Sequence, residues 1–349
     1  MRMGGDQGCS AAFAPPLVMG RRSDSTTAAG NAGEPAGGCP WHGSPGPRAL
    51  RGESPLRTGG AHRSGINWMV SYDPAMLVFA AIAPHATHAL VDGEPPGAET
   101  RSAMAELGAR FEAALPDAVI VLTPHTVHVE GAMAVVTASS AAGDLAQWGS
   151  ADVKLRVPLD TALAITVRDA IRAARISVVG VSYGGNNQAE AVMPMDWATL
   201  IPLWWMGGRS DPQVPAVIVS PARDLSVESH VQAGAAIASA VSGLDRRVAL
   251  VASCDHGHGH LPDGPYGFRP ESAVFDELVC SLVRDDRLAA VAEIDPELVR
   301  AAAADSWWQM LMLAGALGDG WTGQFLAYER PTYVGLMCAA YAPRTASAG

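Results

Sequence analysis

Three histidines at alternate positions are the first group in this sequence that could do chemistry. They lie in "DHGHGHLPDGPYGF" (255–268) as His256, His258 and His260, in a chain that has only ten histidines. An imidazole binds transition metals when it is neutral, and it carries protons near neutral pH because its unperturbed pKa is about 6.5. The cluster is therefore compatible with a metal site, with a catalytic base, or with a His-rich loop that follows a strand.

Two further histidines each follow a short apolar run that ends in Pro-His. His85 comes after "LVFAAIA" (77–83) and His125 after "AVIVL" (118–122). Functional groups of α/β proteins gather where buried strands end, so we expect these histidines and the 256–260 cluster to meet. Two histidines and one carboxylate leave open positions on Fe(II) for a substrate and O₂, whereas the same ligands on Zn²⁺ would activate water. The spacing does not distinguish these metals.

The elements that position the histidines alternate between buried strands and helices. This alternation predicts an α/β domain with a mostly buried central sheet flanked by helices on both faces. Apolar runs predict strands, and helical spacing of apolar residues predicts helices. The predicted strands are 77–83, 118–122, 177–182, 216–220 and 247–253, and the predicted helices are 101–116, 159–174, 227–243, 272–284 and 296–315.

The first 75 residues differ from the rest of the chain. They are rich in Gly, Pro, Ser, Ala and Arg and show no sustained period. Such a segment buries too little apolar surface to offset its ordering entropy. We therefore expect a disordered extension over 1–75 and a single folded domain over 76–345.

Composition excludes several classes of partner. The net charge is −11 and Lys154 is the only lysine, which argues against binding nucleic acid. No apolar run reaches the roughly 18 residues that a membrane helix needs. The five cysteines are scattered and odd in number, which favours reduced thiols in the cytoplasm.

Four sequence blocks together carry a family resemblance: "APH" (83–85), "TPH" (123–125), "DWATLIPLWWMGG" (196–208) and "CDHGHGHLPDGPYGFRPESAVFDELV" (254–279). With them the chain resembles the class III, LigB-type extradiol ring-cleavage dioxygenases from about Met76 to Pro343. The resemblance implies a LigB-like α/β domain with non-haem Fe(II), or alternatively Zn or Mn. It also implies a cytoplasmic enzyme of aromatic catabolism, which uses O₂ to open the ring of a catechol or a 2-aminophenol.

The resemblance also assigns roles to individual residues. His85 and His125 match the two histidine ligands of the metal. His258 matches an active-site histidine, and Asp255 matches the acidic residue ahead of it. We therefore expect His258 and Asp255 to be catalytic.

The chain departs from the family pattern at two positions. Trp197 stands where many members have the histidine that acts as acid and base, and an indole does not transfer protons at neutral pH. His258 is therefore the expected proton carrier. Val274 stands where the ligand glutamate usually precedes the "FD" pair, so we expect Glu271, one helical turn earlier, to be the third ligand.

Two other functions remain open at this stage. A hydrolase could use the same ligands to activate water, and a Memo-like or inactive chain could keep the fold and bind metal without opening rings. The expected partners are a small aromatic substrate and O₂. Some enzymes of the family are built from two subunits, so we expect a homo-oligomer or a pairing with a homologous subunit.

Overall fold

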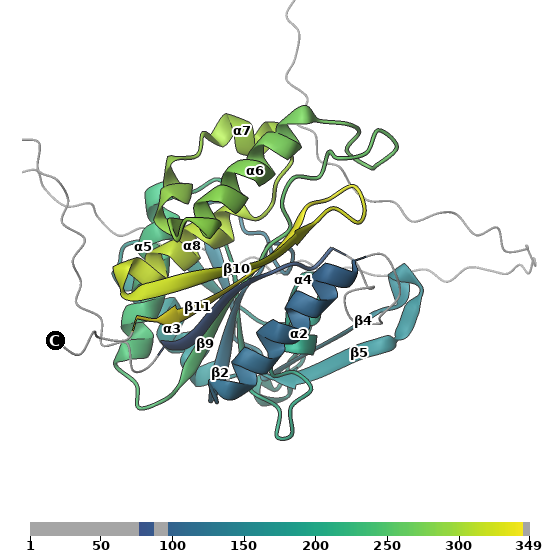
Figure 1. Cartoon of the computed structure of the whole chain (residues 1–349). Coiled ribbons are helices and arrows are strands. Elements are labelled where there is room, and N and C mark those ends of the chain that lie inside the picture. Colours follow the sequence, from purple (N-terminus) through teal and green to yellow (C-terminus); the bar gives the residue numbers. More distant parts are fainter. Residues whose placement is uncertain (1–76, 87–96, 345–349) are drawn as a thin grey trace, which may run out of the picture. The chain divides into compact units, whose positions relative to one another are not determined.

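The computed structural model describes residues 77–86 and 97–344, all of which belong to one compact unit, Asn67–Gly349. The extension over 1–75, the boundary at Met76 and the last residue of the expected domain lie outside the described residues. The described part confirms the expected fold class, a mixed α/β structure with a large central sheet between helices (Figure 1). None of its helices combines the length and the apolar character that a membrane span requires.

The central sheet has eight strands in the order β10-β11-β1-β9-β2-β8-β3-β6. Its middle is parallel, because β1 pairs with β9, β9 with β2, and β2 with β8 in the same direction. Antiparallel pairing attaches β11 to β1, β10 to β11, and β3 to β8, while β6 runs parallel to β3. The strands are β1 (Leu77–Ala83), β2 (Ala118–Leu122), β3 (Met133–Val136), β6 (Val178–Val181), β8 (Ala216–Ser220), β9 (Val248–Ser253), β10 (Trp321–Glu329) and β11 (Leu336–Pro343).

Both faces of this sheet are buried, which explains why its middle strands are continuous apolar runs. In β2, Ile120 and Leu122 belong to one core and Val119 and Val121 to the other. Figure 1 shows α5, α6, α7 and α8 gathered apart from α2 and α4. The helices are α2 (Ala98–Ala113), α3 (Thr161–Ala173), α4 (Trp197–Trp205), α5 (Val227–Ser242), α6 (Pro270–Arg284), α7 (Pro296–Ala301) and α8 (Trp307–Leu317).

A second sheet of three strands lies with α2 and α4 in the same apolar core. Its order is β5-β4-β7, formed by β5 (Ser150–Pro158), β4 (Ser140–Leu145) and β7 (Val192–Pro194). The short 3₁₀ turn η1 (Ala146–Trp148) joins β4 to β5 and carries Trp148. After β7 the chain enters α4, whose first turn is capped by Asp196 through the Thr199 amide at 3.0 Å.

The segment expected as one helix over 296–315 forms two helices. Helix α7 ends at Ala301, α8 begins at Trp307, and Ala303 between them has a positive φ of 50°. A non-glycine residue in this left-handed region ends the helical hydrogen-bond ladder. The break leaves Asp305 and Ser306 in a short connection between the two helices.

Candidate metal centre

The ends of three neighbouring parallel strands place the predicted site residues together. His85 follows β1, Asp255 follows β9, and His125 follows β2, and these strands are adjacent in the order β1-β9-β2. Parallel strands end at the same edge of a sheet, about 4.8 Å apart. The expectation that His85 and His125 share an edge is thus met by the topology.

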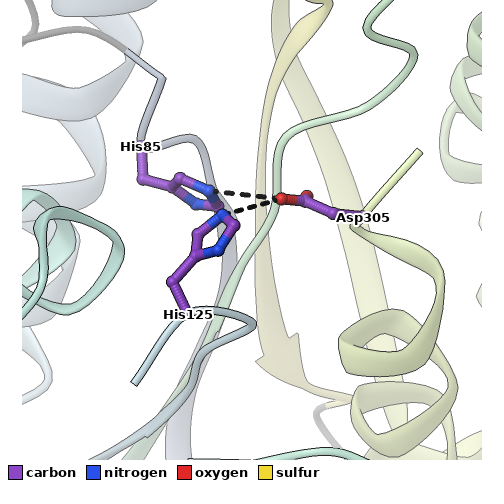
Figure 2. A group of neighbouring side chains, drawn as sticks. All are labelled: His85, His125 and Asp305. Carbon is purple, nitrogen blue, oxygen red and sulfur yellow. Dashed lines mark ion pairs between the residues drawn. The ribbon is translucent and has the colours of Figure 1, made fainter. Parts of the chain in front are cut away.

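A third side chain joins the two histidines. His125 Nε2 lies 3.0 Å from Asp305 Oδ2, and His85 Nε2 lies 3.6 Å from the same oxygen. Figure 2 shows both rings pointing to this carboxylate from two separate segments of the chain. One ligand atom from each of the three residues lies within 4.8 Å of the others. His85 and Asp305 are buried, and His125 is partly exposed, so the group is open to solvent on one side.

The hydrogen bonds of His85 determine which ring nitrogen is free. Ser253 Oγ donates to the carbonyl of Ala198 at 2.6 Å, so it accepts the hydrogen of His85 Nδ1 at 2.8 Å. In the neutral ring this leaves a lone pair on Nε2. That atom is buried and has no hydrogen-bond partner among the described residues. A buried imidazole nitrogen with a free lone pair, aimed at a second imidazole and a carboxylate, fits a divalent transition metal.

Two buried carboxylates surround this nitrogen. Asp255 Oδ1 accepts the backbone amide of His85 at 2.9 Å, and Asp255 Oδ2 lies 3.6 Å from His85 Nε2. Burial opposes charge on all three groups. Even so, Asp255 and Asp305 raise the pKa of His85, and the adjacent rings of His125 and His85 bring the pKa of Asp305 well below its usual range. Burial and the nearby charge of Asp305 raise the pKa of Asp255. The site is therefore built to hold positive charge.

Asp305 takes the place in this group that the sequence had assigned to Glu271. Glu271 lies in the first turn of α6, half-buried, and does not belong to the His85, His125 and Asp305 group, which is the one cluster of metal-binding type that the described residues contain. The first turn of α6 is fixed by Ser272, whose hydroxyl bonds Gly259 and Ala302. We therefore replace Glu271 by Asp305 as the proposed third ligand.

The three alternate histidines have three different environments, because the segment 256–260 lies beyond the end of β9. His256 Nδ1 bonds Ser306 Oγ at 3.0 Å, and His260 Nε2 bonds the carboxylate of Asp276 at 2.8 Å. His258 Nδ1 lies 2.8 Å from the carbonyl of His256, so it donates its hydrogen there and leaves a lone pair on Nε2.

His258 is also the member of the cluster that lies among aromatic residues. Its ring centroid is 5.2 Å from that of Tyr266 and 6.0 Å from that of Tyr333. The backbone amide of His258 donates to the carbonyl of Ala302 at 3.1 Å, three residues before Asp305, so His258 lies near the connection that carries the proposed third ligand. His258 thus combines a ring nitrogen that has no hydrogen-bond partner among the described residues with a position near that connection.

Trp197 lies against the metal centre. Its ring stacks on His125 with a centroid distance of 4.6 Å and an angle of 27°, and Trp148 packs on it edge-on at 4.8 Å. Helix α4 positions Trp197 as its first residue, directly after the capping Asp196. Asp196 also accepts the hydroxyl of Thr126, the residue after His125. Trp197 therefore supplies a flat apolar wall at the position expected to carry an acid or base.

Comparisons with known proteins place the chain in a family. The family described as the catalytic LigB subunit of aromatic ring-opening dioxygenase matches residues 80–338. Protein CA_C1420 of Clostridium acetobutylicum is 23% identical over 221 residues, which cover 63% of this chain and 47% of that protein. The chain thus spans about half the length of this curated relative.

A likeness in fold extends to a solved structure. The crystal structure of the uncharacterized protein JW3007 from Escherichia coli K12 superposes with a TM-score of 0.51 at 16% identity. The match covers 75% of this chain and 99% of that one, and at this identity it bears on the fold alone. Because the family match extends over most of the described structure, this chain belongs to the LigB family.

Proposed function

We propose that this protein is an Fe(II)-dependent extradiol dioxygenase that opens the ring of a catechol or a 2-aminophenol. The observation that supports it most is the convergence of His85 Nε2, His125 Nε2 and the Asp305 carboxylate at the edge of the sheet. Two histidines and one carboxylate are the ligand set of many non-haem Fe(II) oxygenases. Family membership supports ring opening in general, and the iron and the type of substrate are part of the proposal.

The ligand set determines what a bound metal would contribute. Fe(II) held by His85, His125 and Asp305 would offer open positions to two adjacent substrate oxygens, or to an oxygen and a nitrogen, and to O₂. All other tasks belong to side chains of the chain itself. They must orient the ring, keep water away, and move protons from and to the reacting oxygens.

His258 is the proposed proton carrier. Its Nδ1 hydrogen is committed to the carbonyl of His256, so Nε2 is the atom that can accept a substrate proton and later return it. The two neighbouring histidines are less suited to this role. His260 is bonded to the buried Asp276, and His256 has an unpartnered Nε2 that is buried away from solvent. A positioned acid or base of this kind contributes about 10²- to 10⁴-fold to a rate.

Aromatic side chains pack on two histidines of the site. Trp197 stacks on His125, and Tyr266 and Tyr333 pack around His258. Flat rings of this kind bind another ring by offset or edge-on stacking, and they limit the access of water. Asp255 orients His85 through the backbone amide and thereby holds one ligand in place. These aromatic side chains favour a planar aromatic substrate.

The decisive experiment is reconstitution of the full chain with Fe(II) under anaerobic conditions. A panel of catechols and 2-aminophenols is then added with O₂, and O₂ uptake is recorded together with the absorbance of yellow ring-opened products. We expect one substrate class to consume one O₂ per ring opened, and protein loaded with Zn²⁺ to consume none. Absence of O₂ uptake with the whole panel would refute the proposal and favour a Memo-like metal-binding role. Zn²⁺-dependent hydrolysis would favour the hydrolase instead.

A further inference from the structure

A cavity of about 360 Å³ opens at the end of the central sheet opposite the metal centre. It is lined by Arg344, which follows β11, and by Trp321, at which β10 begins. Because β11 runs antiparallel to β1, its end lies beside the start of β1, whereas His85 follows the end of that strand. Helix α8 has 11 residues and spans about 16 Å; its first turn follows Asp305, and its last turns line the cavity. The cavity is therefore separate from the metal centre.

The buried part of the cavity lining is apolar. It comes from four elements, namely Leu288 of the 3₁₀ helix η3 (Leu288–Glu293), Ala314 and Leu317 of α8, Trp321 of β10 and Tyr341 of β11. Aliphatic and aromatic side chains together offer a dry surface to the apolar body of a small molecule, as in most ligand sites of proteins.

One polar atom of this lining residue set has no partner. The hydroxyl of Tyr341 is buried and makes no hydrogen bond within the described part of the chain. Burial, together with the nearby charge of Asp286, raises the pKa of Tyr341, so the hydroxyl keeps its hydrogen. Buried polar groups of native proteins are nearly always hydrogen-bonded. An unpaired hydroxyl on a residue that lines a cavity therefore points to a partner that the chain itself does not supply.

The rim of the cavity carries charges of both signs. Arg344 donates to the carboxylate of Asp286 at 2.9 Å, so these two charges compensate each other. The charged groups of Arg287, Glu293 and Asp319 are exposed and form no ion pair or hydrogen bond with other described residues. They border the same cavity without pairing with one another, which leaves one guanidinium and two carboxylates available to a ligand.

The charges and the apolar lining together select a class of ligand. A guanidinium binds a carboxylate with two parallel hydrogen bonds, and carboxylates bind an ammonium group. A ligand with a charge of one sign is attracted by one part of the rim and repelled by the other. The ligand that fits carries a carboxylate and an ammonium group at one end and an apolar body at the other.

We propose that this cavity binds a free α-amino acid with a large apolar side chain. Arg287 binds the carboxylate, Glu293 and Asp319 bind the ammonium group, and the side chain of the ligand packs against Trp321 and Tyr341. The cavity shares no residue with the metal centre, so this binding site is independent of the proposed function.

The first part of the test measures binding to the full chain by calorimetry, with Fe(II)-loaded and with metal-free protein. The probes are L-leucine, L-methionine, L-phenylalanine and L-tryptophan. For the amino acid that binds best, the amine that lacks the carboxylate and the acid that lacks the ammonium group are compared with it. We expect that amino acid to bind equally well with and without metal, and each analogue to bind about 10- to 100-fold more weakly, because each loses a charged hydrogen bond.

The second part uses variants of the rim. Arg287→Gln should weaken binding of the amino acid about 10- to 100-fold and leave the amine unchanged. The double variant Glu293→Gln, Asp319→Asn should weaken the amino acid similarly and leave the acid unchanged. Arg175→Gln is the control, because Arg175 is also exposed and unpaired among the described residues but does not line the cavity. It should bind the amino acid like the wild type.

Thermal midpoints of all variants are recorded with the calorimetry, and substitutions at these exposed positions should leave them close to that of the wild type. Three results would overturn the inference: no binding of any of the four amino acids, binding that requires the metal, or unchanged affinity in both rim variants. The presence or absence of ring opening does not bear on any of these measurements, so the proposed function and this inference fail separately.

Discussion

Ser253 holds the ring of His85 through a hydrogen bond, so Ser253→Ala tests how this proposed ligand is prepared for a metal. The hydroxyl accepts from His85 Nδ1 at 2.8 Å and donates to the carbonyl of Ala198 at 2.6 Å, and all three groups are buried. Without it, the His85 ring loses the partner that fixes its tautomer and orientation. Loss of such an outer partner typically weakens metal binding about 10- to 100-fold.

The same substitution also costs stability. It leaves the His85 Nδ1 hydrogen and the Ala198 carbonyl unsatisfied in the interior, which costs about 1–3 kcal/mol of unfolding free energy. The two effects are separated by a matched control. Ser272 is equally buried, and its hydroxyl accepts from Gly259 N–H at 2.9 Å and donates to the Ala302 carbonyl at 2.9 Å. Ser272→Ala should therefore lose similar stability without touching a proposed ligand.

The assay is a metal titration of the full chain, with urea unfolding of the metal-free protein measured beside it. We expect Ser253→Ala to raise the Kd for Fe(II) about 10- to 100-fold, and Ser272→Ala to leave it within about 3-fold of the wild type. If both variants lose equal stability and Ser253→Ala binds metal as tightly as the wild type, Ser253 does not prepare His85 and the argument from the free Nε2 atom fails.

The remaining predictions concern catalysis, pH and the extension. His258→Ala should keep the metal and lower kcat about 10²- to 10⁴-fold in O₂ uptake, whereas His260→Ala should cost far less. Burial lowers the pKa of His230, so the unfolded chain binds a proton that the folded one does not, and stability should fall as the pH drops below about 6.5. His230→Leu should flatten that slope by up to about 1.4 kcal/mol per pH unit in urea titrations at several pH values; an unchanged slope would mean that His230 is not responsible. A protein that begins at Met76 should keep its thermal midpoint and metal content, and a loss of more than a few degrees would show that the extension packs on the domain.

The parallel middle of the sheet could be predicted from the sequence, because strands buried on both faces are continuous apolar runs. The runs 77–83, 118–122 and 216–220 match β1, β2 and β8 as the structure has them. The edge strand β6 was also predicted, over 177–182, whereas β3, β10, β11 and the small sheet were not. In β5 the buried residues alternate with exposed ones, and β10 is largely half-buried, so neither stands out as an apolar run.

Asp305, the third proposed ligand, was not predicted because of the sequence that surrounds it. Asp305 follows four consecutive alanines and precedes an apolar stretch, a pattern that favours one continuous helix. The structure instead breaks the chain at Ala303, whose left-handed backbone nothing in the local sequence demands. The sequence did offer one indication of the site: a single aspartate, directly followed by Ser306, in the middle of the predicted apolar helix. An isolated acidic residue in such a place requires a buried partner.

The roles of the three alternate histidines also could not be predicted without the structure. Alternation would place them on one face only if the segment were a regular strand, and β9 ends at Ser253. Beyond that point each ring is directed by a different partner: Ser306 for His256, two tyrosines for His258, and Asp276 for His260. Sequence resemblance selected His258, and the structure gives a physical reason for that choice: His260 is bonded to Asp276, and the unpartnered Nε2 of His256 is buried away from solvent.

The central claim is that His85, His125 and Asp305 together bind one divalent metal, and metal content per chain tests it most directly. The wild type and the single alanine variants at these three positions and at Glu271 are loaded with Fe(II) anaerobically, freed of excess metal and analysed. We predict one metal per chain in the wild type and in Glu271→Ala, and loss of stoichiometric metal in the other three variants. One metal per chain in Asp305→Ala together with its loss in Glu271→Ala would contradict the account.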